Sequence, residues 1–211
     1  ADADADDTGD ADDDADAEPE PYACGWPRND PGSLVSTGSD VGDVVENVEL
    51  TDQCGETVSL WDFYDEYTLV LFTTVWEPIF GDYGSLEGLQ ADFTEREGLP
   101  MRFAVYIFED EATAPATTET VADFADAHSL SEIPVFADPD STILSAASLS
   151  IAELAYMPQL CMIAPDRTLL GCNAGFDAEH PFERDFDLAR EHAFPDDADA
   201  DDDDDADDDA D

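Results

Sequence analysis

The sequence contains no lysine, and six arginines stand against 56 aspartates and glutamates, giving a formal net charge of −50. Because nucleic-acid binding depends on Lys and Arg contacts to phosphate, this shortage excludes a nucleic-acid partner. It also disfavours anionic membrane surfaces, which attract basic segments. No stretch reaches the roughly 18 apolar residues that a membrane-spanning helix needs. We therefore expect no nucleic acid, no transmembrane segment and only a loose attraction of cations.

The acidic residues are concentrated at the two ends of the chain. About 11 lie in the first 20 residues and about 12 in residues 196–211, where Asp and Ala alternate. Neither end has the large apolar side chains that offset the loss of chain entropy on folding. Residues 1–21 are therefore predicted to be an acidic disordered tail or tether, and residues 196–211 a second acidic tail. Residues 22–195 hold every Trp, Phe and Tyr and are predicted to form one domain.

Cysteine is scarce, with four residues in 211. Cys24 lies in a loop-like Cys-Gly-Trp-Pro stretch and Cys54 in a Gln-Cys-Gly-Glu turn, so we predict a disulfide between them, with two unpaired thiols as the alternative. A disulfide implies an oxidising compartment. Together with Ala1 in place of an initiator Met, it predicts an extracytoplasmic protein: periplasmic, an outer-membrane lipoprotein or secreted. A salt-adapted source would explain the same excess of acids.

The apolar pattern predicts strands alternating with helices. Residues 68–75 form an uninterrupted β-branched and aromatic run, as expected of a strand buried on both faces. Apolar residues at helical spacing predict a helix over Asp82–Glu97 that ends at Gly98. The other expected elements are a strand–turn–strand at 43–60, strands at 101–108, 134–136, 159–164 and 168–172, and helices from about 117, at 142–149 and at 178–192. This order predicts an α/β fold with a central mixed β-sheet flanked by helices.

Three motifs occur in a characteristic order between Gly42 and Phe194. Val48–Phe63 contains Leu-Thr-Asp-Gln-Cys-Gly and then Val-Ser-Leu, Val70–Trp76 is an apolar strand that ends in tryptophan, and Tyr156–Asp166 places Met-Pro before another apolar strand. Together they resemble the thioredoxin-like redoxins, both the AhpC/TSA peroxiredoxins and the TlpA/ResA-like thiol-disulfide proteins. The resemblance implies a thioredoxin-like fold with an N-terminal β-hairpin. It also implies a cis proline at Pro158, facing the redox site.

The resemblance places the two redox cysteines of the family at Glu77 and Phe80, where this chain has no sulfur. Disulfide exchange and peroxide reduction need a thiolate that can attack and leave again, and a carboxylate cannot replace it. No catalytic residue is therefore predicted there, and the protein is expected to be redox-inactive. We expect the family groove to persist as a binding surface for a peptide or protein partner. It would be lined by Trp76, Glu77, Pro78, Phe80, Met157 and Pro158.

Cys161 and Cys172 lie on the two strands of a predicted C-terminal hairpin. A two-residue turn at Asp166-Arg167 would place them opposite each other, within reach of a disulfide. A three-residue turn, Pro165–Arg167, puts them on opposite faces of the sheet. The resemblance implies the longer turn, so buried structural thiols are expected. A bridge between them stays open, and with it the alternative of a thiol-disulfide oxidoreductase or peroxidase-like enzyme.

The remaining polar residues predict no metal or cofactor site. His128, His180 and His192 are scattered without the spacing of metal ligands. Asp2, Asp4, Asp6 and Asp7 have the spacing of part of a Ca²⁺ loop but lack its glycine at the turn position and its closing glutamate, so only weak Ca²⁺ association with the acidic tails is expected. An acidic cation-binding surface protein that acts through its tails is the other alternative. The aromatic cluster of Trp61, Phe63 and Tyr64 is expected to be core rather than groove.

Overall fold

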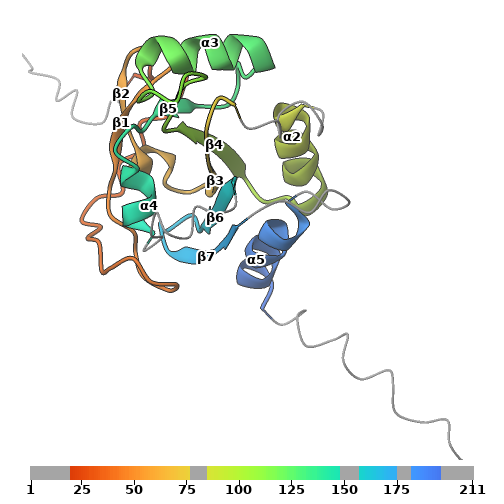
Figure 1. Ribbon diagram of the computed structural model, residues 1–211. Helices are drawn as coiled ribbons and strands as arrows, with labels where there is room; N and C mark the ends of the chain where they lie inside the picture. The colour runs from red at the N-terminus through yellow and green to blue at the C-terminus, as the bar shows by residue number, and fades with distance from the viewer. Residues whose placement is uncertain (1–19, 77–84, 148–156, 175–181, 196–211) are drawn as a thin grey trace, which may run out of the picture.

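The computed structural model describes residues 20–76, 85–147, 157–174 and 182–195 (Figure 1). The acidic stretches at 1–19 and 196–211 lie outside this part of the chain. The described residues contain seven strands. These are β1 (Glu49–Asp52), β2 (Thr57–Ser59), β3 (Tyr67–Thr73), β4 (Met101–Ile107), β5 (Val135–Ala137), β6 (Gln159–Ile163) and β7 (Leu169–Ala174).

The strands form one mixed sheet in the order β2-β1-β5-β4-β3-β6-β7. β4 runs parallel to its neighbours β3 and β5. The remaining pairs are antiparallel, including the N-terminal hairpin β1–β2 and the C-terminal hairpin β6–β7. The predicted strands at 68–75, 101–108 and 159–164 are therefore confirmed to within one or two residues, and they occupy the centre of the sheet.

The described residues also contain five helices: the 3₁₀ helix η1 (Leu60–Phe63) and the α-helices α2 (Leu86–Glu97), α3 (Thr118–His128), α4 (Thr142–Ala146) and α5 (Glu183–Ala193), of which α5 follows the last strand. α2 begins at Leu86 rather than at the predicted Asp82, because Ser85 has an extended backbone and its hydroxyl accepts a hydrogen bond from Gly88 N. It ends at Gly98, as predicted, in a left-handed conformation with φ 68°. The predicted start of the last helix at Ala178 lies outside the described residues.

The core consists of two layers, one on each face of the sheet. Alternate residues of β3 point to opposite faces: Leu69 and Leu71 pack with α2, α3 and α5, whereas Val70 and Phe72 pack with α4 and η1. Figure 1 shows α2 and α5 on one side of the sheet and α4 on the other. Phe63 is fully buried in the layer beneath α4 and the partly buried Trp61 packs against this layer, as expected, whereas Tyr64 is half-buried and belongs to neither core layer.

No helix among the described residues is both long and apolar enough to cross a membrane. The longest, α2, has 12 residues, and only Leu86 and Phe93 of it are buried.

Candidate functional site

All four cysteines are in disulfides. The predicted bond between Cys24 and Cys54 is present and links the segment before β1 to the turn between β1 and β2, with 6.0 Å between the Cα atoms. Cys54 is exposed and Cys24 is half-buried. An attacking thiol therefore reaches this bond from solvent, on the side of Cys54.

The carboxylate of Asp52 organises both sides of this disulfide. Asp52 is fully buried at the end of β1, and its Oδ1 accepts hydrogen bonds from Cys54 N and Glu56 N, both at 2.9 Å. Its Oδ2 accepts a hydrogen bond of 2.8 Å from the indole Nε1 of Trp26, two residues after Cys24. One carboxylate thus fixes the turn that carries Cys54 and the loop that carries Cys24. These charge-assisted bonds inside the protein are stronger than neutral ones.

Further contacts hold the Cys24 loop independently of the disulfide. The hydroxyl of Tyr22 donates a hydrogen bond to Asp62 at 2.8 Å, and Asn29 Nδ2 donates to the carbonyl of Tyr64 at 2.6 Å. Burial and the hydrogen bond to Asp62 raise the pKa of Tyr22 to about 12, so this hydroxyl stays protonated near neutral pH. Because these contacts do not involve sulfur, we expect the two cysteines to remain neighbours when the bond is reduced.

A surface groove of about 500 Å³ lies against this disulfide. Cys24, Gln53 and Cys54 form one wall, and the C-terminal half of α3 with the residues that follow it forms the other. Gln53 joins the two walls, since its side-chain amide donates to Leu130 O of the second wall at 3.4 Å and to Ile133 O at 3.0 Å, and its oxygen accepts from Val135 N at 2.7 Å. The disulfide therefore borders a groove of defined shape that is open to solvent.

The second disulfide, Cys161–Cys172, corrects our expectation of buried free thiols. The hairpin does have the predicted three-residue turn, with Arg167 N donating to Ala164 O and Arg167 at φ 71°. That turn alone would put the two cysteines on opposite faces. A register shift follows, however: Ile163 pairs with Leu169 but Met162 pairs with Gly171, so one extra residue restores the direct pairing of Cys161 with Cys172.

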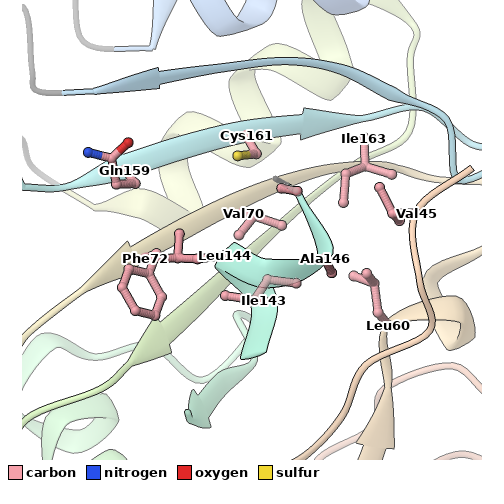
Figure 2. A pocket seen from close by; sticks show the side chains of 11 residues that line it. Val45, Leu60, Val70, Phe72, Ile143, Leu144, Ala146, Gln159, Cys161 and Ile163 are labelled. Carbon is pink, nitrogen blue, oxygen red and sulfur yellow. The ribbon is translucent and has the colours of Figure 1, made fainter. Parts of the chain in front are cut away.

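This second disulfide is much less accessible than the first. Cys161 is 3% exposed, and Cys172 is half-buried on the edge strand β7. Figure 2 shows Cys161 on β6 among apolar side chains of the layer beneath α4. The gap beside it measures about 10 Å³, which is at most the space of one water molecule. No ligand or attacking thiol can approach from this side without movement of the core.

The residues at the family's redox position are only partly described. Glu77, Pro78 and Phe80 lie outside the described residues. Trp76 is 49% exposed just after β3. The bond Met157–Pro158 is cis, as the resemblance implies, with Pro158 buried and Met157 half-buried just before β6.

Trp76 and Pro158 leave the sheet at the same end, since Phe72 of β3 pairs with Gln159 of β6. A groove of about 610 Å³ is present beside the end of β3, but Val75, α3 and the loop before α3 line it, not Trp76, Met157 or Pro158. The binding surface predicted at these residues stays a prediction.

The two histidines in the described part of the chain, His128 and His192, make different contacts. The ring of His128 packs on Phe124, and burial lowers its pKa. His192 Nδ1 lies 2.9 Å from the hydroxyl of Tyr67. His180 lies outside the described residues.

Comparison with known proteins identifies the fold. No family model and no curated protein matches the sequence. Solved structures do match. Peroxidoxin BcpB from Mycobacterium tuberculosis has a TM-score of 0.53 at 17% identity, over 73% of this chain and 97% of that one. A putative thiol:disulfide interchange protein DsbE from Chlorobium tepidum has a TM-score of 0.53 at 17% identity, over 74% and 96%. Thiol peroxidase from Chromobacterium violaceum has a TM-score of 0.51 at 14% identity, over 76% and 89%.

The chain has the thioredoxin-like fold. Identities of this size show the fold and leave the activity to be argued from the residues themselves.

Two residues that shape these sites were missed at the sequence level, although each leaves a signal. Asp52 stands two residues before Cys54 in an Asp-x-Cys-Gly turn, the spacing at which an Asp side chain caps its own turn. Gly171 interrupts an otherwise apolar strand, which often marks a bulge or a close approach. Both features occur at Gly171: the register shift lies beside it, and a Cβ at this position would lie 3.0 Å from Leu188 Cδ1 of α5. The first signal predicts the turn, whereas the second marks only a position where a strand irregularity can occur and does not fix the register.

Proposed function

We propose that this protein is a thiol-disulfide oxidoreductase in which Cys24–Cys54 is the bond that exchanges with a partner. The observation that carries the proposal is the placement of this disulfide at the surface, with Cys54 exposed, beside a groove of about 500 Å³. Exposed disulfides are the labile ones in proteins, whereas buried structural ones resist reduction. The thioredoxin-like fold is compatible with this activity but does not by itself supply it.

The two cysteines have different roles in this scheme because their exposure differs. In the reduced protein, the thiolate of Cys54 attacks one sulfur of a partner disulfide, forming a mixed disulfide and releasing one partner thiolate, which takes up a proton. The thiol of Cys24 then loses its proton and attacks the sulfur of Cys54. This step releases the second partner thiol and restores Cys24–Cys54. Two electrons pass to the partner, and a dithiol reductant returns them to the protein by the same steps in reverse.

The contacts around the site support repeated cycling. Asp52 holds Trp26 and the Cys54 turn together through hydrogen bonds that reduction does not break. The attacking and resolving sulfurs therefore stay close in the dithiol form, which favours closure of the bond over capture by a second partner.

The presence of two disulfides in this chain favours a cysteine-based redox role. It disfavours the redox-inactive protein that we expected because Glu77 and Phe80 stand at the cysteine positions of the redoxins. The alternative pair, Cys161–Cys172, is a weaker candidate for exchange, since Cys161 is 3% exposed and faces the core. We assign it a structural role in the C-terminal hairpin. Both bonds also support the proposal that the protein works outside the cytoplasm, where disulfides persist.

The proposal is tested by single-turnover exchange with a neutral aromatic disulfide such as 4,4′-dithiodipyridine. The fully reduced double variant Cys161→Ser/Cys172→Ser should release two equivalents of pyridinethione and end as the Cys24–Cys54 disulfide. Adding Cys24→Ser to it should release one equivalent and leave a mixed disulfide on Cys54, visible as added mass. Adding Cys54→Ser instead leaves the half-buried Cys24, which we expect to react about tenfold more slowly, because access controls the attack.

Turnover provides the second half of the test. The wild-type protein should accelerate the reduction of a peptide disulfide by a dithiol, and the variant Cys24→Ser/Cys54→Ser should not. The variant Cys161→Ser/Cys172→Ser is the matched control and should keep the acceleration. If the wild-type protein gives no more than the uncatalysed rate, or if only the Cys161/Cys172 variant loses activity, the assignment to Cys24–Cys54 is wrong.

A further inference from the structure

We propose that reduction converts the Cys24–Cys54 disulfide into a binding site for a thiophilic divalent metal ion such as Zn²⁺, with Asp52 as the third ligand. A sulfur atom of each cysteine and a carboxylate oxygen of Asp52 lie within 4.8 Å of one another. Among the described residues this is the only group of three or more His, Cys, Asp or Glu side chains with that closeness. The inference requires the bond to be reducible but does not require that the protein turn over a partner.

The distances suit a tetrahedral site once the sulfurs are no longer bonded. Zn²⁺ binds thiolate sulfur at about 2.3 Å and carboxylate oxygen at about 2.0–2.2 Å, so ligand atoms in a tetrahedral site lie roughly 3.8 Å apart. The Cα atoms of Cys24 and Cys54 are 6.0 Å apart. Rotation of the two cysteine side chains between staggered conformations can therefore separate the sulfurs to this spacing without moving the backbone.

Asp52 retains one free position for a metal ion despite its three hydrogen bonds. A carboxylate has about four lone-pair sites, two on each oxygen. Oδ1 uses two of them for Cys54 N and Glu56 N, whereas Oδ2 uses one for Trp26 Nε1. In our proposal the second site on Oδ2 takes the metal ion, since the hydrogen bonds of the described residues use the other three. The hydrogen bonds on the other three sites orient the ligand, as outer contacts do in known metal sites.

The charge balance and the setting also favour a cation. Two thiolates and one carboxylate carry three negative charges, which Zn²⁺ reduces to one. Cys24 and Cys54 line the groove, from which water could supply the fourth ligand of a tetrahedral ion. In the oxidised protein neither sulfur carries a negative charge, so the site forms only on reduction. Binding releases the two thiol protons and withholds both sulfurs from exchange.

The test uses the full-length protein and Co²⁺, whose absorption reports tetrahedral geometry and thiolate ligands, followed by displacement with Zn²⁺. A phosphine reduces the disulfides, taking oxygen from water to become its oxide, and is removed under nitrogen. Excess Mg²⁺ occupies the acidic tails, whose carboxylates give no sulfur-to-cobalt band. We expect one equivalent of Co²⁺ with that band in the reduced wild-type protein and none in the oxidised protein.

Variants identify the ligands. The band should persist in Cys161→Ser/Cys172→Ser and disappear in Cys24→Ser/Cys54→Ser. Asp52→Asn should bind Co²⁺ at least about tenfold more weakly, because a neutral amide replaces an anionic ligand. Absence of the band in reduced wild-type protein that keeps its circular dichroism overturns the proposal, and this comparison needs no mutation. A band that persists in Cys24→Ser/Cys54→Ser would show that the metal binds elsewhere and would also overturn the proposal. Unchanged Co²⁺ affinity in Asp52→Asn would show that Asp52 is not the third ligand.

Discussion

Cys161 on β6 and Cys172 on β7 lie directly opposite each other, with Cα atoms 4.1 Å apart, although the turn between them has three residues. An odd number of turn residues would place them on opposite faces. The shift in pairing between Met162 and Ile163 compensates for the turn and brings the two sulfurs together.

This arrangement predicts that the pair contributes to stability more than to exchange. The bond closes a loop with a sequence separation of 11 residues. The entropy of such a loop in the unfolded chain corresponds to about 2–3 kcal/mol. Cys161→Ala/Cys172→Ala should lower the free energy of unfolding in urea by that amount and leave the exchange rate with a small disulfide within about twofold of wild type. A stability equal to that of the wild-type protein would contradict this role.

The register shift between β6 and β7 is a feature that could not be predicted from the sequence. Patterns of apolar residues located the hairpin and its turn correctly, because both depend on residues that are close in the chain. At Gly171, next to the shift, a Cβ would lie 3.0 Å from Leu188 Cδ1 of α5, 17 positions later in the sequence. The local apolar pattern contains no information on such contacts between elements, so it does not specify the register.

Asp52→Asn tests whether one carboxylate organises the candidate site. The amide can still accept hydrogen bonds through its oxygen, but its NH₂ group meets the indole N–H of Trp26, which then loses its partner. We expect a loss of about 2–3 kcal/mol in the free energy of unfolding, since hydrogen bonds to charged groups and buried unpaired donors are of this size. Urea titration measures the loss.

The control for Asp52→Asn is Asp30→Asn. Asp30 is exposed, and its Oδ1 accepts a hydrogen bond from Gly32 N at 2.7 Å in an Asx turn. It should change stability by less than about 0.5 kcal/mol. Equal effects of the two variants would show that Asp52 has no special role.

Arg167→Met tests a buried cation that holds the C-terminal hairpin to the rest of the sheet. Arg167 is fully buried, and its guanidinium donates to Thr68 Oγ1 at 3.1 Å and to the carbonyl oxygens of Leu60, Pro165 and Glu66. Burial lowers its pKa to about 10, still well above neutral pH. Methionine fills the space but leaves these acceptors unpaired, so the free energy of unfolding should fall by about 2–4 kcal/mol.

The matched control for Arg167 is Arg184→Met on the exposed side of α5. Thermal unfolding should show little change for that variant. A similar melting temperature for the two variants would mean that the hydrogen bonds of Arg167 contribute no net stability.

We expect the stability of the Asp185→Asn variant, relative to the wild-type protein, to increase with pH. Asp185 is 2% exposed in the first turn of α5, and burial raises its pKa above the ordinary value. A carboxyl group whose pKa is raised by folding stabilises the protein while it is protonated, and this contribution is lost as the pH rises through the raised pKa. The amide keeps the hydrogen bond that Asn173 Nδ2 donates at 2.8 Å.

Asp185→Asn should therefore match the wild-type protein at or below about pH 4, near the ordinary pKa of Asp, and exceed it at pH 7. Urea midpoints at both values give the comparison. Asp92→Asn, an exposed site on α2, corrects for the loss of one negative charge. A gain at pH 7 no larger than that of Asp92→Asn would show that burial does not destabilise the charged form of Asp185.

The candidate site shows the same division between local and distant information as the hairpin. The Cys24–Cys54 pair could be predicted because both residues stand in short loop motifs. The contact between Trp26 and Asp52 and the groove against α3 could not, because they join segments far apart in the chain. The α/β class followed from the order of the predicted strands and helices. The thioredoxin-like fold followed from the resemblance carried by residues 48–63, 70–76 and 156–166.

We propose that Cys24–Cys54, and not Cys161–Cys172, is the bond that exchanges with a partner. Limiting amounts of a dithiol are added to the native protein, free thiols are alkylated, and mass spectrometry then measures the modification of each of the four cysteines. We predict that Cys24 and Cys54 become fully alkylated at reductant concentrations that leave Cys161 and Cys172 oxidised. Reduction of Cys161–Cys172 first, or of both pairs together, would show that Cys24–Cys54 is not the more reactive disulfide and that our assignment is wrong.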